Sequence, residues 1–200
     1  TLIVMVFIIV LALIARHAVL HGDEKPSGLQ NFVEMIVEML DNLVKGSMGR
    51  HWRPFVNYIG TIMVFIFFAN TSGLFGLRPP TADYGTTLAL ALITFVLIQY
   101  SAFKTSNDLV FTDLFKPIPI LFPINLIGEF ATPLSMSLRL FGNIMAGTIM
   151  MALWYGLLPW LAQLGIPAFL HMYFDLFSGA IQTFVFAMLT MTFITDKREA

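Results

Sequence analysis

Long apolar segments constrain this chain more than any other feature. A helix needs about 20 apolar residues to cross the hydrocarbon core of a bilayer, and about five such segments can be found here. Only 12% of the 200 residues are charged and 58% are hydrophobic, whereas an ordinary soluble domain carries about 25% charged residues. A water-soluble globule could not hide this much apolar surface. We therefore predict an all-α integral membrane protein, formed as a single membrane domain over residues 1–200.

The predicted membrane helices cover residues 1–20, 54–77, 86–103, 123–160 and 166–195. Segment 1–20 lacks the basic start and the small-residue cleavage site of a signal peptide, so we interpret it as a true membrane helix whose upstream tail is absent from this sequence. Segment 123–160 is too long for one upright crossing and must be strongly tilted or bent. We expect it to form a long tilted hairpin with 166–195.

Segment 28–45 has a different pattern. Its apolar residues follow helical spacing, and its charged residues fall on another face, which predicts an amphipathic helix on the membrane surface. The apolar positions are Phe32, Val33, Ile36, Met39, Leu40, Leu43 and Val44, and the charged ones are Glu34, Glu38, Asp41 and Lys45.

The distribution of Lys and Arg predicts the orientation, because cytoplasmic loops are enriched in these residues. The side predicted to be cytoplasmic holds Arg16, Lys25, Lys45, Arg50, Arg53, Lys104, Lys116, Lys197 and Arg198. Arg78 then lies outside and Arg139 lies within the membrane. The N-terminus is expected outside and the C-terminus in the cytoplasm.

Arg139 lies in the middle of an apolar stretch, where a charged side chain costs roughly 2.5–3.5 kcal/mol on insertion scales. Snorkelling to the headgroups is the alternative, but either end of the stretch is far from this position. Ser135 and Asn143 lie four residues to either side and share its helical face. A stripe of this kind favours contact with protein or with an aqueous cavity.

The last segment carries a second polar stripe. Four polar residues follow the spacing i, i+4, i+7 and i+11 on an otherwise apolar helix: His171, Asp175, Ser178 and Gln182. Each alone could make an interhelical hydrogen bond, but four aligned polar groups favour the lining of a wet path. Asp and His in such a path are proton-relay candidates.

Two further carboxylates are candidates with open alternatives. Glu129 is either a transport residue or part of a salt bridge near the membrane interface. Asp83, in RPPTADYG, either lies at the outer mouth of an ion path or caps the N-terminus of the following helix.

Motifs of soluble enzymes are absent: the sequence has no P-loop, GxSxG, HExxH or glycine-rich nucleotide fingerprint. The chain has no cysteine, and its four histidines lack metal-ligand spacing. We expect no cofactor, no bound metal, no nucleic-acid partner and no catalysis of ATP chemistry by this chain itself.

The strings PLSMSLRLFGNIMAG and AIQTFVFAMLT resemble subunit a of the F-type ATP synthase membrane sector. The resemblance extends to QNFVEMIVEML, FFANTSGLFG and PTADYGTTLALAL, and so covers nearly the whole chain. It implies a stator subunit with two offset aqueous half-channels, which packs its tilted hairpin against a rotating c-ring. It also implies peripheral-stalk b subunits as partners, the F1 sector as an indirect partner, and the lipid of a membrane. The single-chain length and style favour a bacterial plasma membrane.

The resemblance implies roles for individual residues. Arg139 is the essential arginine, Gln182 is its partner on the last helix, and Asn143 lies one turn away. Glu129 falls in the cytoplasmic half-channel, whereas Asp83, Asp175 and His171 belong to the outer one.

The sequence departs from many relatives at Thr148, where they carry an acidic residue or His. Many of them also have His where this chain has Asp175. Relative to those proteins, the ionisable group would have moved from one helix to the helix that faces it. This favours Asp175 over Thr148 as the ionisable residue of the outer half-channel. The main alternative function is a self-contained secondary transporter or channel, but such folds commonly show repeated halves, and no repeat is visible here.

Overall fold

The computed structural model describes residues 1–20, 28–105, 122–157 and 166–199. Within these ranges the chain forms helices and no strand, which confirms the all-α class. The α-helices are α1 (Leu2–Leu20), α2 (Gly28–Met48), α3 (Val56–Thr71), α4 (Tyr84–Thr105), α6 (Phe122–Leu157), α7 (Ile166–His171) and α8 (Ser178–Glu199). Shorter 3₁₀ turns are η1 (Gly49–His51), η2 (Ser72–Phe75) and η3 (Pro80–Ala82), and η5 (Met172–Phe177) is a π-helical segment.

Four helical stretches among the described residues are long and apolar enough to cross a membrane, which confirms a multi-pass membrane protein. They are Val56–Phe75, Tyr84–Lys104, Phe122–Leu157 and Phe169–Arg198. The apolar part of α1, Leu2–His17, is shorter. Residues 158–160 of the predicted fourth span, and most of the predicted hairpin tip, lie outside the described residues.

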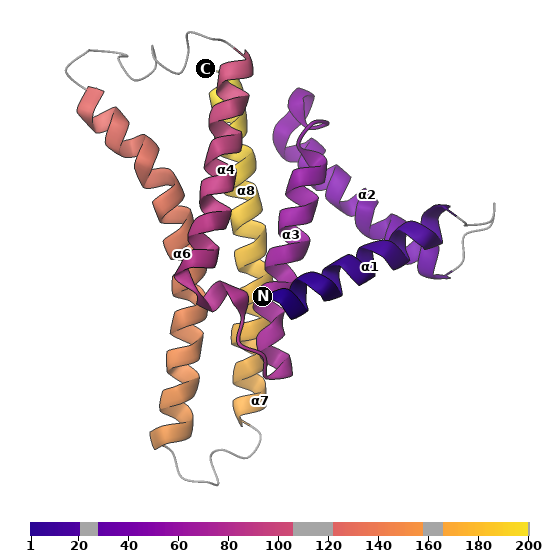
Figure 1. Cartoon of the computed structure of the whole chain (residues 1–200), viewed down its shortest axis with the longest axis vertical. Helices are drawn as coiled ribbons and strands as arrows, with labels where there is room; N and C mark the ends of the chain where they lie inside the picture. Colours follow the sequence, from indigo (N-terminus) through magenta and orange to yellow (C-terminus); the bar gives the residue numbers. More distant parts are fainter. Residues whose placement is uncertain (21–27, 106–121, 158–165, 200) are drawn as a thin grey trace.

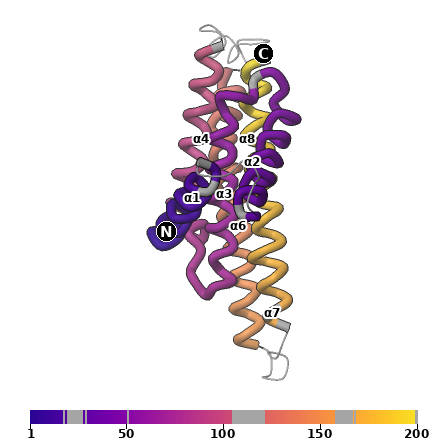
Figure 2. The backbone as a smooth tube through the Cα atoms, turned by 90° about the vertical axis from the view of Figure 1, so that its right-hand side faces the viewer, coloured from indigo at the N-terminus to yellow at the C-terminus, as the bar shows by residue number. Residues whose placement is uncertain are grey.

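The bundle is elongated along α4, α6 and α8, while α1 and α2 lean away from it (Figures 1 and 2). One buried cluster joins α2, α3, α4 and α8 and contains Val44, Met48, Phe55, Ile59, Ile98, Ala187, Met191 and Ile194. A second cluster joins α3, α4, α6 and α8 and contains Ile62, Ile66, Ala91, Met136, Leu140 and Phe186. The two clusters hold α8 in the centre of the bundle and leave much of α6 uncovered.

Helix α6 leans away from α4 at its upper end and is bent along its length (Figure 1). Pro133 lies inside this helix and is buried. Proline lacks a backbone N–H and its ring crowds the preceding turn, which is the usual cause of a bend in a long helix. The bend explains how one helix can hold 36 residues.

Helix α2 has the amphipathic pattern that the sequence predicts, but only part of its apolar face meets protein. Val44 and Met48 are fully buried against the rest of the bundle. Phe32 and Met39 are exposed, so the first part of this face is left uncovered within the described chain.

Helices α3 and α8 lie close together at Gly179. A Cβ atom added there would lie 2.9 Å from Cβ of Asn70. The buried Asn70 side chain also donates a hydrogen bond to the Gly179 carbonyl (3.3 Å) and accepts one from Thr81 (2.8 Å). Glycine is therefore required by packing at this crossing.

We predict that Gly179→Ala lowers the thermal stability of the detergent-solubilised chain by about 1–3 kcal/mol, the usual cost of overpacking. Gly46→Ala on α2 is the control, because nothing lies within 4 Å of an added Cβ there. Both changes improve helix propensity equally, so the difference between their melting curves reports the clash. Equal melting curves would contradict the packing account.

Candidate functional site

Cavities open along α6 at three levels. The upper cavity, about 560 Å³, is lined by α4, α6 and α8, including Glu129 and Lys197. The central cavity, about 230 Å³, contains Ser135 and Arg139. The lower cavity, about 450 Å³, is lined by residues 144–151 of α6 together with His171 and Asp175. Because the upper and central cavities share Gly128, Thr132 and Phe193, open space follows α6 from its upper end down to the arginine.

Arg139 is exposed on α6, and no ion pair or hydrogen bond joins it to any other described residue. Ser135 lies one turn before it and is also exposed. The guanidinium is therefore not held by a carboxylate of the described chain. An arginine side chain stays protonated in proteins, so this surface of α6 presents a fixed positive charge to whatever lies beside it.

Asn143 and Ser178 join the predicted polar stripes of α6 and α8. The Ser178 hydroxyl donates to Oδ1 of Asn143 at 2.8 Å. Gln182, one turn further along α8, is 7% exposed. Among the described residues, Nδ2 of Asn143 and Nε2 of Gln182 have no hydrogen-bond acceptor. No hydrogen bond joins Gln182 to Arg139, although both are described, so the partnership implied by the resemblance is not seen as a direct contact.

His171 and Asp175 form a pair in the lower cavity. Nδ1 of His171 lies 2.8 Å from Oδ2 of Asp175, and Asp175 lies in the π-helical segment η5. The carboxyl group also packs against Gly73 of η2, where an added Cβ would lie 3.0 Å from Oδ2. π-Helical turns are rare and occur frequently at functional sites.

The walls of the lower cavity come from different helical segments. Thr148 of α6 and Asp175 of η5 line the same cavity. Thr148 donates its hydroxyl to the Ile144 carbonyl (2.9 Å), and Gly147 allows close approach of the Phe174 side chain. An ionisable group on either wall would therefore reach the same space.

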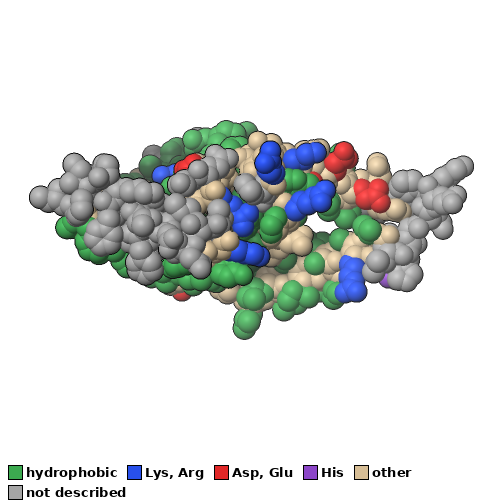
Figure 3. Space-filling model, turned by 90° about the horizontal axis from the view of Figure 1, so that it is seen from above, with side chains coloured by type: hydrophobic (Ala, Val, Ile, Leu, Met, Phe, Trp, Pro, Cys, Tyr) green, Lys and Arg blue, Asp and Glu red, His purple; other side chains and the backbone are tan. Residues whose placement is uncertain are grey.

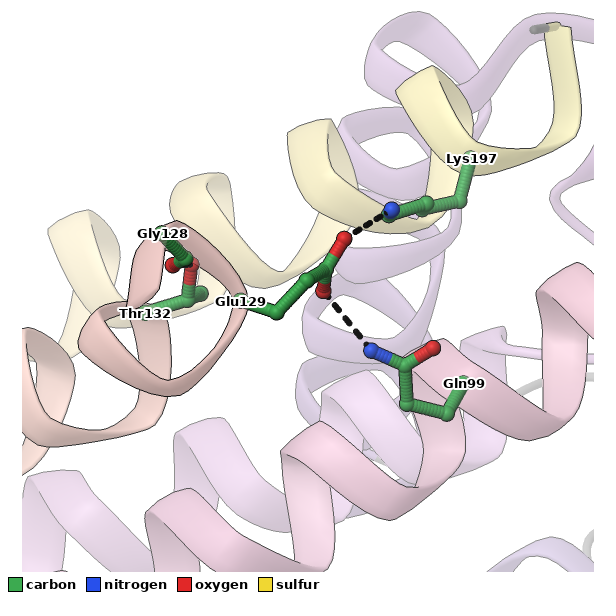
Figure 4. Close-up of polar contacts among 5 residues, drawn as sticks. All are labelled: Gln99, Gly128, Glu129, Thr132 and Lys197. Carbon is green, nitrogen blue, oxygen red and sulfur yellow. Dashed lines mark hydrogen bonds and ion pairs between the residues drawn. The ribbon is translucent and has the colours of Figure 1, made fainter. Parts of the chain in front are cut away.

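Glu129 lies in the wall of the upper cavity and is bound from two sides (Figure 4). Lys197 of α8 forms an ion pair with Oε1, and Gln99 of α4 donates to Oε2 at 2.8 Å. The salt bridge that the sequence left as an alternative is thus present, and so is the cavity. A transport role for Glu129 stays a prediction.

Asp83 is exposed and accepts the backbone N–H of Gly85 at 3.2 Å. Its carbonyl accepts from Thr86 and Thr87 in the first turn of α4. This is the helix-capping alternative. The lower cavity is lined by the neighbouring Arg78, Pro79 and Ala82; a channel role for Asp83 stays a prediction.

Three residues of this arrangement were not predicted as site residues. Lys197 entered the sequence argument only as a positive charge at the C-terminus, and Asn70 and Gln99 were not considered. Gln99 did offer a signal, since it is a polar residue within the apolar run LALALITFVLIQYSAF. The contacts of Gln99 and Lys197 with Glu129 and of Asn70 with Gly179 join residues 30 to 109 positions apart in sequence, so spacing could not reveal them.

Comparison with known proteins identifies relatives. The family model described as ATP synthase A chain matches residues 1–195. The protein "ATP synthase subunit a, sodium ion specific" of Propionigenium modestum is 42% identical over 186 residues, covering 84% of this chain and 63% of the relative. "ATP synthase subunit a" of Priestia megaterium is 40% identical over 190 residues, covering 86% of this chain and 80% of the relative. The chain thus spans a little under two thirds of the first relative.

We predict that Gly73→Ala displaces the Asp175 carboxyl group, because the new methyl group would overlap it. The displaced group turns into the lower cavity, so labelling of Asp175 by a water-soluble carbodiimide, measured by mass spectrometry, should rise several-fold. Gly85→Ala is the control, since its added Cβ makes only ordinary contact with Asp83 (3.6 Å). Unchanged labelling in Gly73→Ala would show that the carboxyl group does not depend on this glycine.

Proposed function

The chain belongs to the ATP synthase A chain family, and on that premise we propose that it is the ion-conducting stator subunit a of an F-type ATP synthase. The observation that carries the proposal is Arg139 on α6, which has no partner among the described residues and lies between a cavity toward each end of the bundle. Two offset half-channels pass protons to and from carboxylates of a rotating c-ring. Ion flow is thereby coupled to rotation, and rotation to ATP synthesis or hydrolysis in the F1 sector, while this chain carries out no ATP chemistry.

Arg139 separates the two half-channels by charge. A c-ring carboxylate facing the fixed guanidinium is favoured in its ionised form, so it releases its proton on one side before it passes. The same cation repels a proton that would leak directly from one cavity to the other. Lysine serves this purpose less well because burial can neutralise it. The contact must stay hydrated and transient, since a dry ion pair would hold the ring in place.

The distribution of charge supports the proposed orientation. Basic residues lie at or near helix ends at the upper end of the bundle, namely Arg50, Arg53, Lys104, Lys197 and Arg198. Figure 3 shows Lys and Arg side chains gathered on that face. With this end in the cytoplasm, the upper cavity belongs to the cytoplasmic half-channel and the lower cavity to the outer one. The peripheral-stalk b subunits are further proposed partners.

The transported ion is proposed to be the proton. One relative is named as sodium ion specific, so sodium is the competing ion. ATP-driven uptake of radioactive sodium, measured beside acidification in sodium-containing buffer, distinguishes the two, since only a sodium-carrying complex would accumulate the labelled ion.

We predict that Arg139→Ala abolishes ATP-driven pumping by the reconstituted ATP synthase, because the half-channels lose the charge that separates them. Pumping is followed by quenching of a pH-sensitive dye in proteoliposomes, with assembly checked by co-purification of the c-ring and F1. Arg50→Ala, an exposed arginine outside the cavities, is the control and should pump normally. Normal pumping by Arg139→Ala would refute the role.

We predict that Asp175→Ala slows pumping by about 10-fold or more, as expected when a proton-transfer group is removed, while the complex still assembles. Glu38→Ala on the exposed surface of α2 is the control for loss of a carboxylate. An assembled Asp175→Ala complex that pumps at the wild-type rate would make Asp175 a structural residue.

A further inference from the structure

The carboxylate of Glu129 on α6 is bound by side chains from two other helices at once, one charged and one polar. Lys197 reaches it from α8 and Gln99 from α4, each taking one carboxylate oxygen (Figure 4). The side chains of Glu129 and Lys197 are each 25% exposed, so the pair lies in the wall of the upper cavity rather than on the open surface.

The neighbouring cation has a different partner. Nε of Arg198 donates to Oγ of Ser101 at 2.7 Å, and its guanidinium lies 5.0 Å from the centre of the Phe55 ring. Arg198 therefore faces α3 and α4, whereas Lys197 faces α6. Of these two adjacent positive charges, only Lys197 is in contact with the Glu129 carboxylate.

The position of this pair along α6 limits what it can do. Glu129 precedes Arg139 by ten residues, which corresponds to about 15 Å of helix at 1.5 Å per residue. A glutamate side chain cannot span that distance. The carboxylate therefore acts at the mouth of the path, and the arginine acts deeper within it.

We propose that Lys197 is a positioning residue of the upper cavity. Its ammonium group holds the Glu129 carboxylate against α8 and α4, so that ions pass this carboxylate at the rate that ATP-driven pumping requires. The inference rests on the proposed function, since it assigns a residue within the cytoplasmic half-channel. Gln99 is the second holding group, because a carboxylate bound at both oxygens cannot rotate freely into the cavity. The same contacts join the leaning upper end of α6 to the centre of the bundle.

The first test removes the ammonium group. Lys197→Gln should lower ATP-driven pumping by the reconstituted complex by about three- to tenfold, a loss at the lower end of the coupling between residues in contact, while Lys197→Arg retains most of the rate. Lys104→Gln removes the same charge from the exposed last turn of α4 and should pump like wild type. Wild-type pumping by an assembled Lys197→Gln complex would overturn the proposal.

A double variant tests whether Lys197 acts through Glu129. If it does, Lys197→Gln adds no further loss once Glu129→Gln is present, because the group that it positions is no longer a carboxylate. Losses that multiply would show that the lysine acts independently of Glu129 and would overturn the proposal.

A chemical rescue separates positioning from assembly. These 200 residues contain no native cysteine, and the wild-type complex treated with the same reagents controls for cysteines of other subunits. Lys197→Cys is assembled, reconstituted and then treated with 2-aminoethyl methanethiosulfonate, which restores an ammonium group, or with the neutral methyl reagent. Pumping should recover only with the cationic reagent. Equal recovery with both reagents, or recovery with neither, would contradict the assigned role of the charge.

The wild-type complex and Arg139→Ala are measured alongside these variants. Failure of the proposed function appears as absent pumping by the wild type or as normal pumping by Arg139→Ala. Failure of the Lys197 inference appears as unchanged pumping by Lys197→Gln in a complex that otherwise behaves as proposed. The two failures are therefore distinguishable.

Discussion

Hydrocarbon offers no hydrogen-bond partners, so each polar group that enters the membrane must find its partner in protein or in a wet cavity. This constraint explains the helices, which satisfy their own backbone, and it also explains where the helices meet. Asn70 links η3 and α8 through Thr81 and the Gly179 carbonyl. Ser178 links α8 to Asn143 of α6. The polar contacts fix the same crossings that the apolar clusters fill.

Arg139 differs from these groups, because it is a charged side chain in a cavity wall and has no partner in the described part of the chain. In the proposed function, a charge that its own chain satisfied could not serve a moving partner. The residues that line the central cavity with it are uncharged. The amides of Asn143 and Gln182 each keep an unbonded nitrogen among the described residues. Cavities lie along α6 toward either end from it, an arrangement that fits the proposed ion path interrupted by a fixed cation.

The membrane class, the main helices and the positions of the polar residues could be predicted because they depend on composition and on spacing along one helix. Arg139 stood out as a charge in an apolar run, and the pairing of His171 with Asp175 follows from their i, i+4 spacing. The contacts of Glu129 could not be predicted in this way. Its two partners come from α4 and α8, and their meeting depends on how three helices pack.

The sequence by itself determined that this chain is a membrane protein, that one arginine lies deep within an apolar segment, and which family the chain belongs to. These properties follow from side-chain chemistry and local periodicity, which act over a few helical turns. Only the tertiary structure decided that the arginine has no partner within the described chain, that Thr148 and Asp175 share one cavity, and that Lys197 holds Glu129. Those facts depend on the bend of α6 and on the close crossing of α3 and α8, and such packing joins residues that are far apart in sequence.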